Sequence, residues 1–156
     1  MRGFKTVAFA AVFGMMAGCG GSSTPTPTAP TYTFTTDTFS DGVLLQNSDI
    51  NSPDFGPVGT PHRITITQAT SQFPGEVDVT IASLGPLSTI TVGIGLTTWN
   101  NSTQSCDLPL QLTTSSAKVG VTVSGQVTAP GDLCVALFDV GNVQGSSTYT
   151  LTIVHS

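Results

Sequence analysis

Apolar and polar residues alternate along most of the chain after Tyr32, with the period of two that is typical of strands. Seven runs carry the pattern: 32–34, 64–66, 77–81, 90–96, 108–112, 119–123 and 149–153. Each places β-branched, aromatic or leucine side chains on one face and mainly polar side chains on the other, as half-buried antiparallel strands require. The segment Leu133–Phe138 is apolar on both faces and predicts a central strand that carries Cys134.

Turn signals separate these runs, and no helical period follows the first 16 residues. The signals are Asp41-Gly42, Pro74-Gly75, Gly85-Pro86, Pro130-Gly131 and Gly141-Asn142. Eight or nine short strands in about 125 residues predict an all-β domain, a single antiparallel β-sandwich over residues 31–156.

The N-terminal segment has a different pattern. Arg2 and Lys5 precede an apolar stretch from Val7 to Met16. This stretch is too short for a permanent transmembrane helix and is typical of a secretory signal.

The end of that segment, Met16-Ala17-Gly18-Cys19, resembles the lipobox of bacterial lipoproteins, with Met16 where leucine is usual. The resemblance implies a signal peptide over 1–18, thioether lipid and an N-terminal acyl chain such as palmitate on Cys19, and a membrane anchor. Gly20, rather than Asp, follows the cysteine and favours the outer membrane of the cell envelope. Residues 20–30 contain mainly Gly, Ser, Thr and Pro, so 19–30 is expected to be a lipidated tether.

The charge of the expected mature chain is strongly negative. Arg63 and Lys118 are its only Lys or Arg residues against nine acids, a formal net charge of −7. Without a basic patch to neutralise phosphates, nucleic acid is excluded as a partner.

Cys106 and Cys134 form an even pair once Cys19 carries lipid. In an exported protein such a pair favours a disulfide, and two separate buried thiols are the alternative. A bridge would close a loop of about 29 residues and contribute about 3.5 kcal/mol in the chain-entropy model.

The segment from His62 to the C-terminus resembles the bacterial pre-peptidase C-terminal domain. The resemblance rests on strand 62–67, the glycine-preceded strand 75–81, the segment Pro130–Val135 and the ending Tyr149–Ile153. It implies a jelly-roll-like β-sandwich that is accessory and not itself catalytic. Many members carry an acidic pair linked to calcium where this chain has Ser88, Thr89 and Thr91, so that calcium role is not carried over.

No residue pattern favours an enzyme. The only histidines are His62, at a strand start, and His155, beside the C-terminus, and no Gly-x-Ser-x-Gly elbow is present. Glu76 and Asp78 share one strand face, but their alternation with valines indicates the solvated side of a strand rather than a glycosidase pair.

Oxygen-rich side chains concentrate before residue 55, including Asp49, Asn51 and Asp54. Alternate oxygen ligands are typical of calcium loops, whereas Asx turns explain the same density without metal. The segment lacks the glycine and closing glutamate of an EF-hand. We therefore expect no cofactor, with Ca²⁺ at these three residues as the alternative.

Trp99 is the only tryptophan and is followed by Asn100 and Asn101. An exposed aromatic ring beside amides is what sugars stack on, whereas a Trp folded back over one open end of the sandwich would be structural. The sequence thus predicts a non-catalytic, lipid-anchored envelope module with a structural or accessory role. The alternative is a carbohydrate- or peptide-binding module around Trp99, whose partner is an envelope protein or glycan.

Overall fold

The chain folds into strands throughout its described part. The computed structural model describes residues 28, 30–47 and 58–156, and these contain nine strands and no helix that is long and apolar enough to cross a membrane. The strands are β1 (Thr35–Leu45), β2 (His62–Ile66), β3 (Gly75–Gly85), β4 (Val92–Asn100), β5 (Ser105–Cys106), β6 (Leu112–Ala117), β7 (Thr122–Val127), β8 (Gly131–Phe138) and β9 (Ser146–His155).

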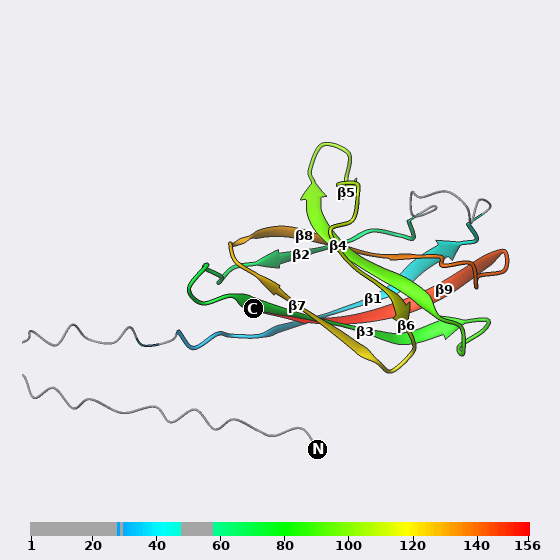
Figure 1. Cartoon of the computed structure of the whole chain (residues 1–156), viewed down its shortest axis with the longest axis horizontal. Helices are drawn as coiled ribbons and strands as arrows, with labels where there is room; N and C mark the ends of the chain where they lie inside the picture. The colour runs from blue at the N-terminus through cyan, green and yellow to red at the C-terminus, as the bar shows by residue number, and fades with distance from the viewer. Residues whose placement is uncertain (1–27, 29, 48–57) are drawn as a thin grey trace, which may run out of the picture.

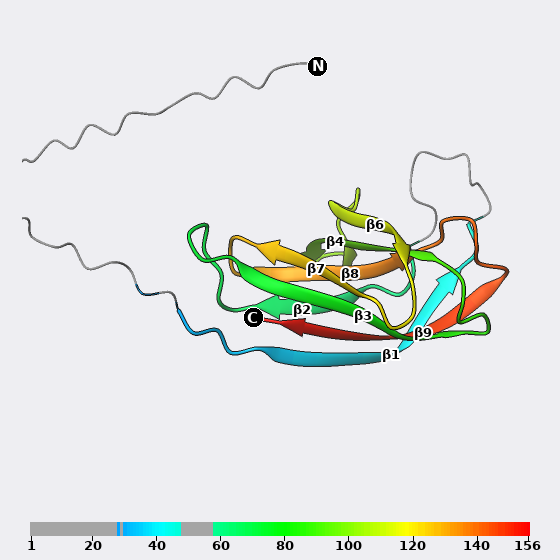
Figure 2. The same ribbon diagram turned by 60° about the horizontal axis from the view of Figure 1, so that its bottom comes forward.

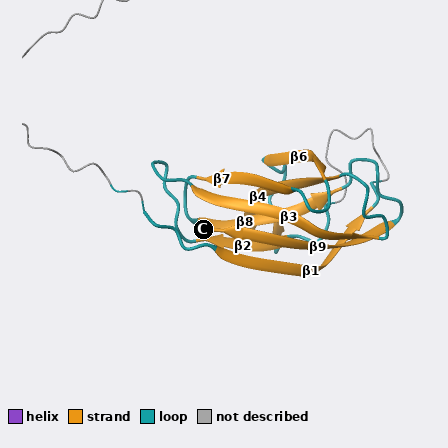
Figure 3. Cartoon of the chain, turned by 90° about the horizontal axis from the view of Figure 1, so that it is seen from below, coloured by secondary structure: helices purple, strands orange, loops and turns teal. Residues whose placement is uncertain are grey.

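The strands form two antiparallel sheets that pack face to face (Figures 1 and 2). One sheet has the order β1-β9-β3-β7, and the other has the order β2-β8-β4-β5, with β6 also paired to β4. This is the strand order of a jelly roll. The predicted all-β antiparallel sandwich is therefore confirmed. Figure 3 shows β1 and β2 along one flank and β6 and β7 along the other.

The main core lies between the two sheets and follows the period-two pattern of the sequence. Val77, Val79 and Ile81 point inward from β3, while Glu76 is exposed and Asp78 half-buried on its outer face. The same alternation on β2, β4, β8 and β9 completes one continuous apolar layer. The strand faces predicted from alternation are thus the faces that the sandwich buries.

A second apolar cluster covers the opposite face of the β8–β4 sheet. We call it the outer cluster; its buried members are Cys106, Leu110, Cys134, Ala136 and Phe138, and Val58, Trp99 and Val140 pack against it. This explains why β8 is apolar on both faces: one side faces the main core and the other lies under the chain that follows β4.

The first strand differs from the sequence expectation. β1 begins at Thr35, so the alternation at 32–34 precedes the strand, and Asp41-Gly42 lies inside it rather than in a turn. A register shift between Phe39 and Gly42 marks a bulge against β9. The Tyr149 ring packs against Gly42, where an added Cβ would stand 2.1 Å from a ring carbon.

The run 108–112 is not a single strand. Leu108 and Leu110 lie in the connection between β5 and β6, with Leu108 68% exposed and Leu110 buried in the outer cluster. The two residues alternate because the Leu110 side chain packs over the sheet while the Leu108 side chain faces solvent. The run 119–123 was also misplaced, because β7 starts only at Thr122.

A buried carboxylate organises the loop between β8 and β9. Asp139 is 4% exposed, and its Oδ1 accepts hydrogen bonds from the backbone N–H groups of Gly141, Asn142 and Val143, each at 2.9 Å. Its Oδ2 accepts one from the N–H of Asn47, also at 2.9 Å. Asp139 therefore links the end of the β1 segment to this loop.

Candidate functional site

The candidate site lies on a hairpin formed by the end of β4 and by β5. Trp99 pairs with Cys106, and Asn100 pairs with Ser105. In Figure 1 this hairpin stands away from the two sheets. Trp99 is the penultimate residue of β4.

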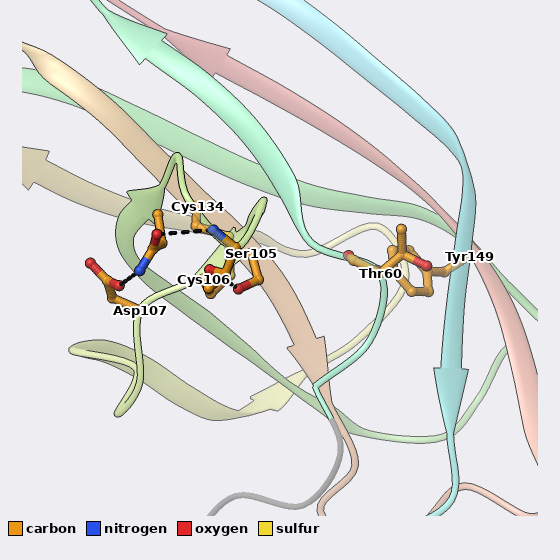
Figure 4. The surroundings of a disulfide bond; sticks show 8 residues. Thr60, Ser105, Cys106, Asp107, Cys134 and Tyr149 are labelled. Carbon is orange, nitrogen blue, oxygen red and sulfur yellow. Dashed lines mark hydrogen bonds between the residues drawn. A yellow bond between two sulfur atoms is a disulfide. The ribbon is translucent and has the colours of Figure 1, made fainter.

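A disulfide fixes the hairpin to the sheet. Cys106 on β5 is bonded to Cys134 on β8, with 5.2 Å between the two Cα atoms (Figure 4). The predicted pairing is present, and the alternative of two separate buried thiols is wrong. Because Cys134 lies opposite Thr97 in the β4–β8 ladder, the bridge holds the hairpin over the outer face of its own sheet.

The Asn100 side chain forms its hydrogen bonds within the hairpin. Its Oδ1 accepts hydrogen bonds from the backbone N–H of Ser102 at 2.9 Å and of Thr103 at 3.2 Å. Its Nδ2 donates to Asp107 Oδ1 at 2.9 Å. These bonds form an Asx-type turn and occupy both ends of the amide, so Asn100 acts chiefly in positioning the hairpin.

Trp99 is half-buried and packs against the outer cluster. It therefore does not cover an open end of the main core, which was its expected structural position. Its Nε1 is buried and has no hydrogen-bond partner within the described part of the chain. The indole contributes to packing over the disulfide while part of it stays at the surface.

A polar network lies on the adjoining outer face of β2 and β8. Asp132 accepts hydrogen bonds from Arg63 Nη2 and from Thr65 Oγ1, each at 2.7 Å. Thr65 first, then Arg63 and finally Asn101 lower the pKa of the Asp132 carboxyl by hydrogen bonding. Asn101, in the turn of the hairpin, thus lies near this network.

The network was not identified from the sequence. Arg63 and Asp132 are 69 residues apart, and only the β2–β8 register brings them to one face. Chemically, the surface combines part of an indole ring, an amide and an ion pair whose arginine side chain is 45% exposed. These groups can stack on and hydrogen-bond to a neutral polar ligand.

The two histidines lie away from this surface. His62 is buried on the inner face of β2 beside Phe39, with ring centroids 4.5 Å apart, and meets the Tyr149 ring edge-on at 5.7 Å. Burial lowers the pKa of His62, an effect that Asp41 partly offsets. His155 is also buried, and its Nε2 lies 3.1 Å from Asp37 Oδ2.

Four of the predicted site residues lie outside the described part of the chain: Cys19, the expected lipidation site, and Asp49, Asn51 and Asp54, the alternative calcium ligands. Of the described candidates, the structure brings Trp99, Asn100, Asn101 and Cys106 together on one hairpin, and the disulfide joins this hairpin to Cys134 on β8.

A scan of protein-family models and a search of curated proteins find no match to this chain.

Proposed function

We propose that this chain is a non-catalytic module of the bacterial cell envelope, anchored by lipid on Cys19 and acting as a structural or accessory domain. The lipobox-like segment and the Gly/Ser/Thr/Pro tether support the anchor. Several acyl chains, at about 0.8 kcal/mol per buried methylene, would make release from the membrane negligible. The outer membrane is the proposed location because Gly20 follows the cysteine.

The observation that carries the proposal is the way the chain enters the sandwich. Tyr32, just after the tether, donates a hydrogen bond from its hydroxyl to the carbonyl of Phe73 in the β2–β3 connection. The next residues continue into β1, which pairs with the C-terminal strand β9. A pull on the tether is therefore transmitted to the edge strand β1 and, through its pairing, to β9, which suits a domain held at a membrane surface.

The histidines support a non-catalytic role. A general base must reach a substrate proton, directly or through one water. His62 instead lies between Phe39 and Tyr149 inside the sandwich, and His155 is buried with a bond to Asp37. Both side chains are buried and make contacts within the fold.

Replacement of Cys19 by Ser, followed by cell fractionation, tests the anchor. The parent chain should remain in the membrane fraction and incorporate a clickable palmitate analogue, and C19S should lose both properties. Ser22→Ala is the matched control, because it changes a residue of the expected tether and leaves Cys19 and the disulfide in place. Membrane retention and labelling of C19S equal to the parent would refute the anchor.

A second function, binding of glycan or peptide at the hairpin, is favoured by the surface position of Trp99 beside Asn101. Quenching of the single tryptophan by added envelope polysaccharide tests it. A saturable change in emission that is lost in Asn101→Ala would favour binding. An unchanged emission spectrum in the presence of polysaccharide would favour the structural role alone.

A further inference from the structure

The edge strand β7 presents a free backbone edge. It pairs with β3 on one side and with no other strand among the residues that the structure describes. The free side of an edge strand carries unpaired N–H and C=O groups, which can pair with another chain. Proteins normally guard such edges with bulges, charges, proline or short length.

The other edges of the sandwich carry such guards. β1 contains the bulge between Phe39 and Gly42, and β6 joins β4 through a register shift between Val92 and Ile94. β2 has only five residues and carries the ion-paired Arg63. β5 has only two residues.

β7, six residues long, has neither a bulge nor a charged residue nor a proline. It pairs with β3 residue for residue, from Thr122 opposite Thr80 to Val127 opposite Gly75, without a register shift. Its sequence, TVSGQV, contains neither charge nor proline, and the preceding Val121 is 51% exposed. β7 is thus a regular, uncharged edge.

A notch opens beside this edge at Gly125. Val123 and Val127 are half-buried against the main core, and Gly125 lies between them in the same alternation. A cavity of about 220 Å³ occurs there, with Leu96, Leu133 and Val127 among its apolar lining residues. Gln111, Gln126 and Thr128 add amide and hydroxyl groups, and no charged residue lines it.

The other face of β7 is acidic. The register places Glu76 opposite Gln126 and Asp78 opposite Ser124. These four residues and Gly125 line a depression of about 500 Å³. The same short edge therefore offers an apolar notch toward one face and two carboxylates toward the other.

We propose that β7 binds an extended segment of a partner protein as an added antiparallel or parallel strand. Backbone groups of the segment would pair with the free edge, and its side chains would alternate between the two faces. The face toward the notch takes a small apolar side chain, and the face toward Glu76 and Asp78 takes Lys or Arg. The partner is therefore a strand in which apolar and basic residues alternate.

Charge argues against a second copy of this chain as the occupant. Joining two β7 edges so that both sandwich layers continue would place the Glu76 and Asp78 carboxylates of both copies on one face. The two β7 strands would lie between the two β3 strands, so these acids would gain no basic partner, and the negative charge of the whole chain would oppose the approach of a second copy. The proposal does not depend on the lipid anchor or on Trp99.

A fluorescein-labelled peptide, acetyl-TVKVKVT-amide, tests the proposal with the full chain purified in detergent. Fluorescence anisotropy should show saturable binding at least tenfold tighter than for acetyl-TVEVEVT-amide or acetyl-TVKPKVT-amide. The first control reverses the charge, and the second removes a backbone donor. Hydrogen exchange measured by mass spectrometry should slow in Thr122–Val127.

Two variants test separately how much the notch and the two acidic residues contribute to peptide binding. Gly125→Val fills the notch and should weaken binding at least tenfold. The double variant Glu76→Gln/Asp78→Asn should abolish the preference for Lys over Glu. Thr36→Val and Asp41→Asn, on the opposite edge strand of the same sheet, are the matched controls and should bind within twofold of the parent. Thermal unfolding verifies that each variant is folded.

Equal affinity for all three peptides, or binding unaffected in both the Gly125 and the acidic variants, would overturn the proposal. A concentration-dependent dimer that Gly125→Val dissociates would assign the edge to a second copy instead. Protection from exchange by polysaccharide, without binding of the lysine peptide, would assign it to glycan.

Discussion

Leu110 lies directly over Gly95. A Cβ atom added to Gly95 would stand 2.3 Å from Leu110 Cδ1 and 2.9 Å from Leu110 Cβ. Leu110 is 5% exposed and belongs to the outer cluster, so the glycine forms part of the floor on which the β5–β6 connection packs. Gly93 has the same relation to Phe138, whose ring would lie 2.2 Å from an added Cβ.

Gly95→Ala should lower the free energy of unfolding by about 1–3 kcal/mol, because the methyl group must displace Leu110. Urea unfolding of the full chain measures the change. Leu110→Ala removes Cδ1, the nearest clashing atom, and keeps only Cβ at 2.9 Å, so the alanine at 95 should cost less in that background. An equal cost of Gly95→Ala in both backgrounds would contradict the contact.

Loss of the disulfide should destabilise the fold. Cys106→Ala/Cys134→Ala should reduce the free energy of unfolding by about 2–4 kcal/mol, because the unfolded chain is no longer cross-linked. Reductant should destabilise the parent by a similar amount and leave the double variant unchanged. Quantitative thiol labelling of both cysteines in the native parent, before any reduction, would be inconsistent with the bridge.

Trp99→Ala should cost about 1–3 kcal/mol, less than the roughly 3–5 kcal/mol of a fully buried tryptophan, because only part of the indole packs on the outer cluster. Trp99→Phe keeps an aromatic ring and should cost less. Urea unfolding compares the three chains, and acrylamide should quench the parent emission partially. A Trp99→Ala chain as stable as the parent would refute the packing role.

His62 should make the fold sensitive to mild acid. Its folded-state pKa lies below the unfolded value of 6.5, so below about pH 6.5 the unfolded state binds more protons. Above about pH 6.5 the imidazole is neutral in both states, and His62 does not lower the free energy of unfolding. As the pH drops from there through the folded-state pKa, the free energy of unfolding falls. The decline in free energy of unfolding between about pH 7 and pH 5 should be smaller in His62→Phe than in the parent. Equal declines would show that other groups dominate.

Asp139→Ala should destabilise the fold by about 2–4 kcal/mol, because four backbone N–H groups lose their shared acceptor. Asp139→Asn keeps one oxygen acceptor and should be milder. Urea unfolding ranks the two variants, and hydrogen exchange at residues 141–143 should accelerate in both. An alanine variant milder than the asparagine variant would contradict the proposed bonding.

The fold could be predicted largely from local alternation. The period of two at Val77–Ile81 and Tyr149–Ile153 defines which face is buried, since successive side chains of a strand point to opposite sides. The disulfide followed from the cysteine count once Cys19 was set aside. The resemblance to a pre-peptidase C-terminal domain and the lipid on Cys19 stay predictions.

The errors arose where contacts with distant parts of the chain, rather than local alternation, set the conformation of a segment. Leu108 and Leu110 alternate like a strand, although they belong to a connection that folds over β4. Asp41-Gly42 resembles a turn but forms a bulge, because Tyr149 requires a residue without a side chain beneath its ring.

The sequence by itself determined the strand-rich character of the chain, its buried faces, its charge and its cysteine pair, because each depends on local order or composition. Only the tertiary structure decided that Trp99 packs against the cluster that contains the disulfide, that Arg63 pairs with Asp132, and that β7 has a free edge beside a cavity. These features depend on which distant strands become neighbours. That choice is set by the packing of both sheets together, and no local pattern encodes it.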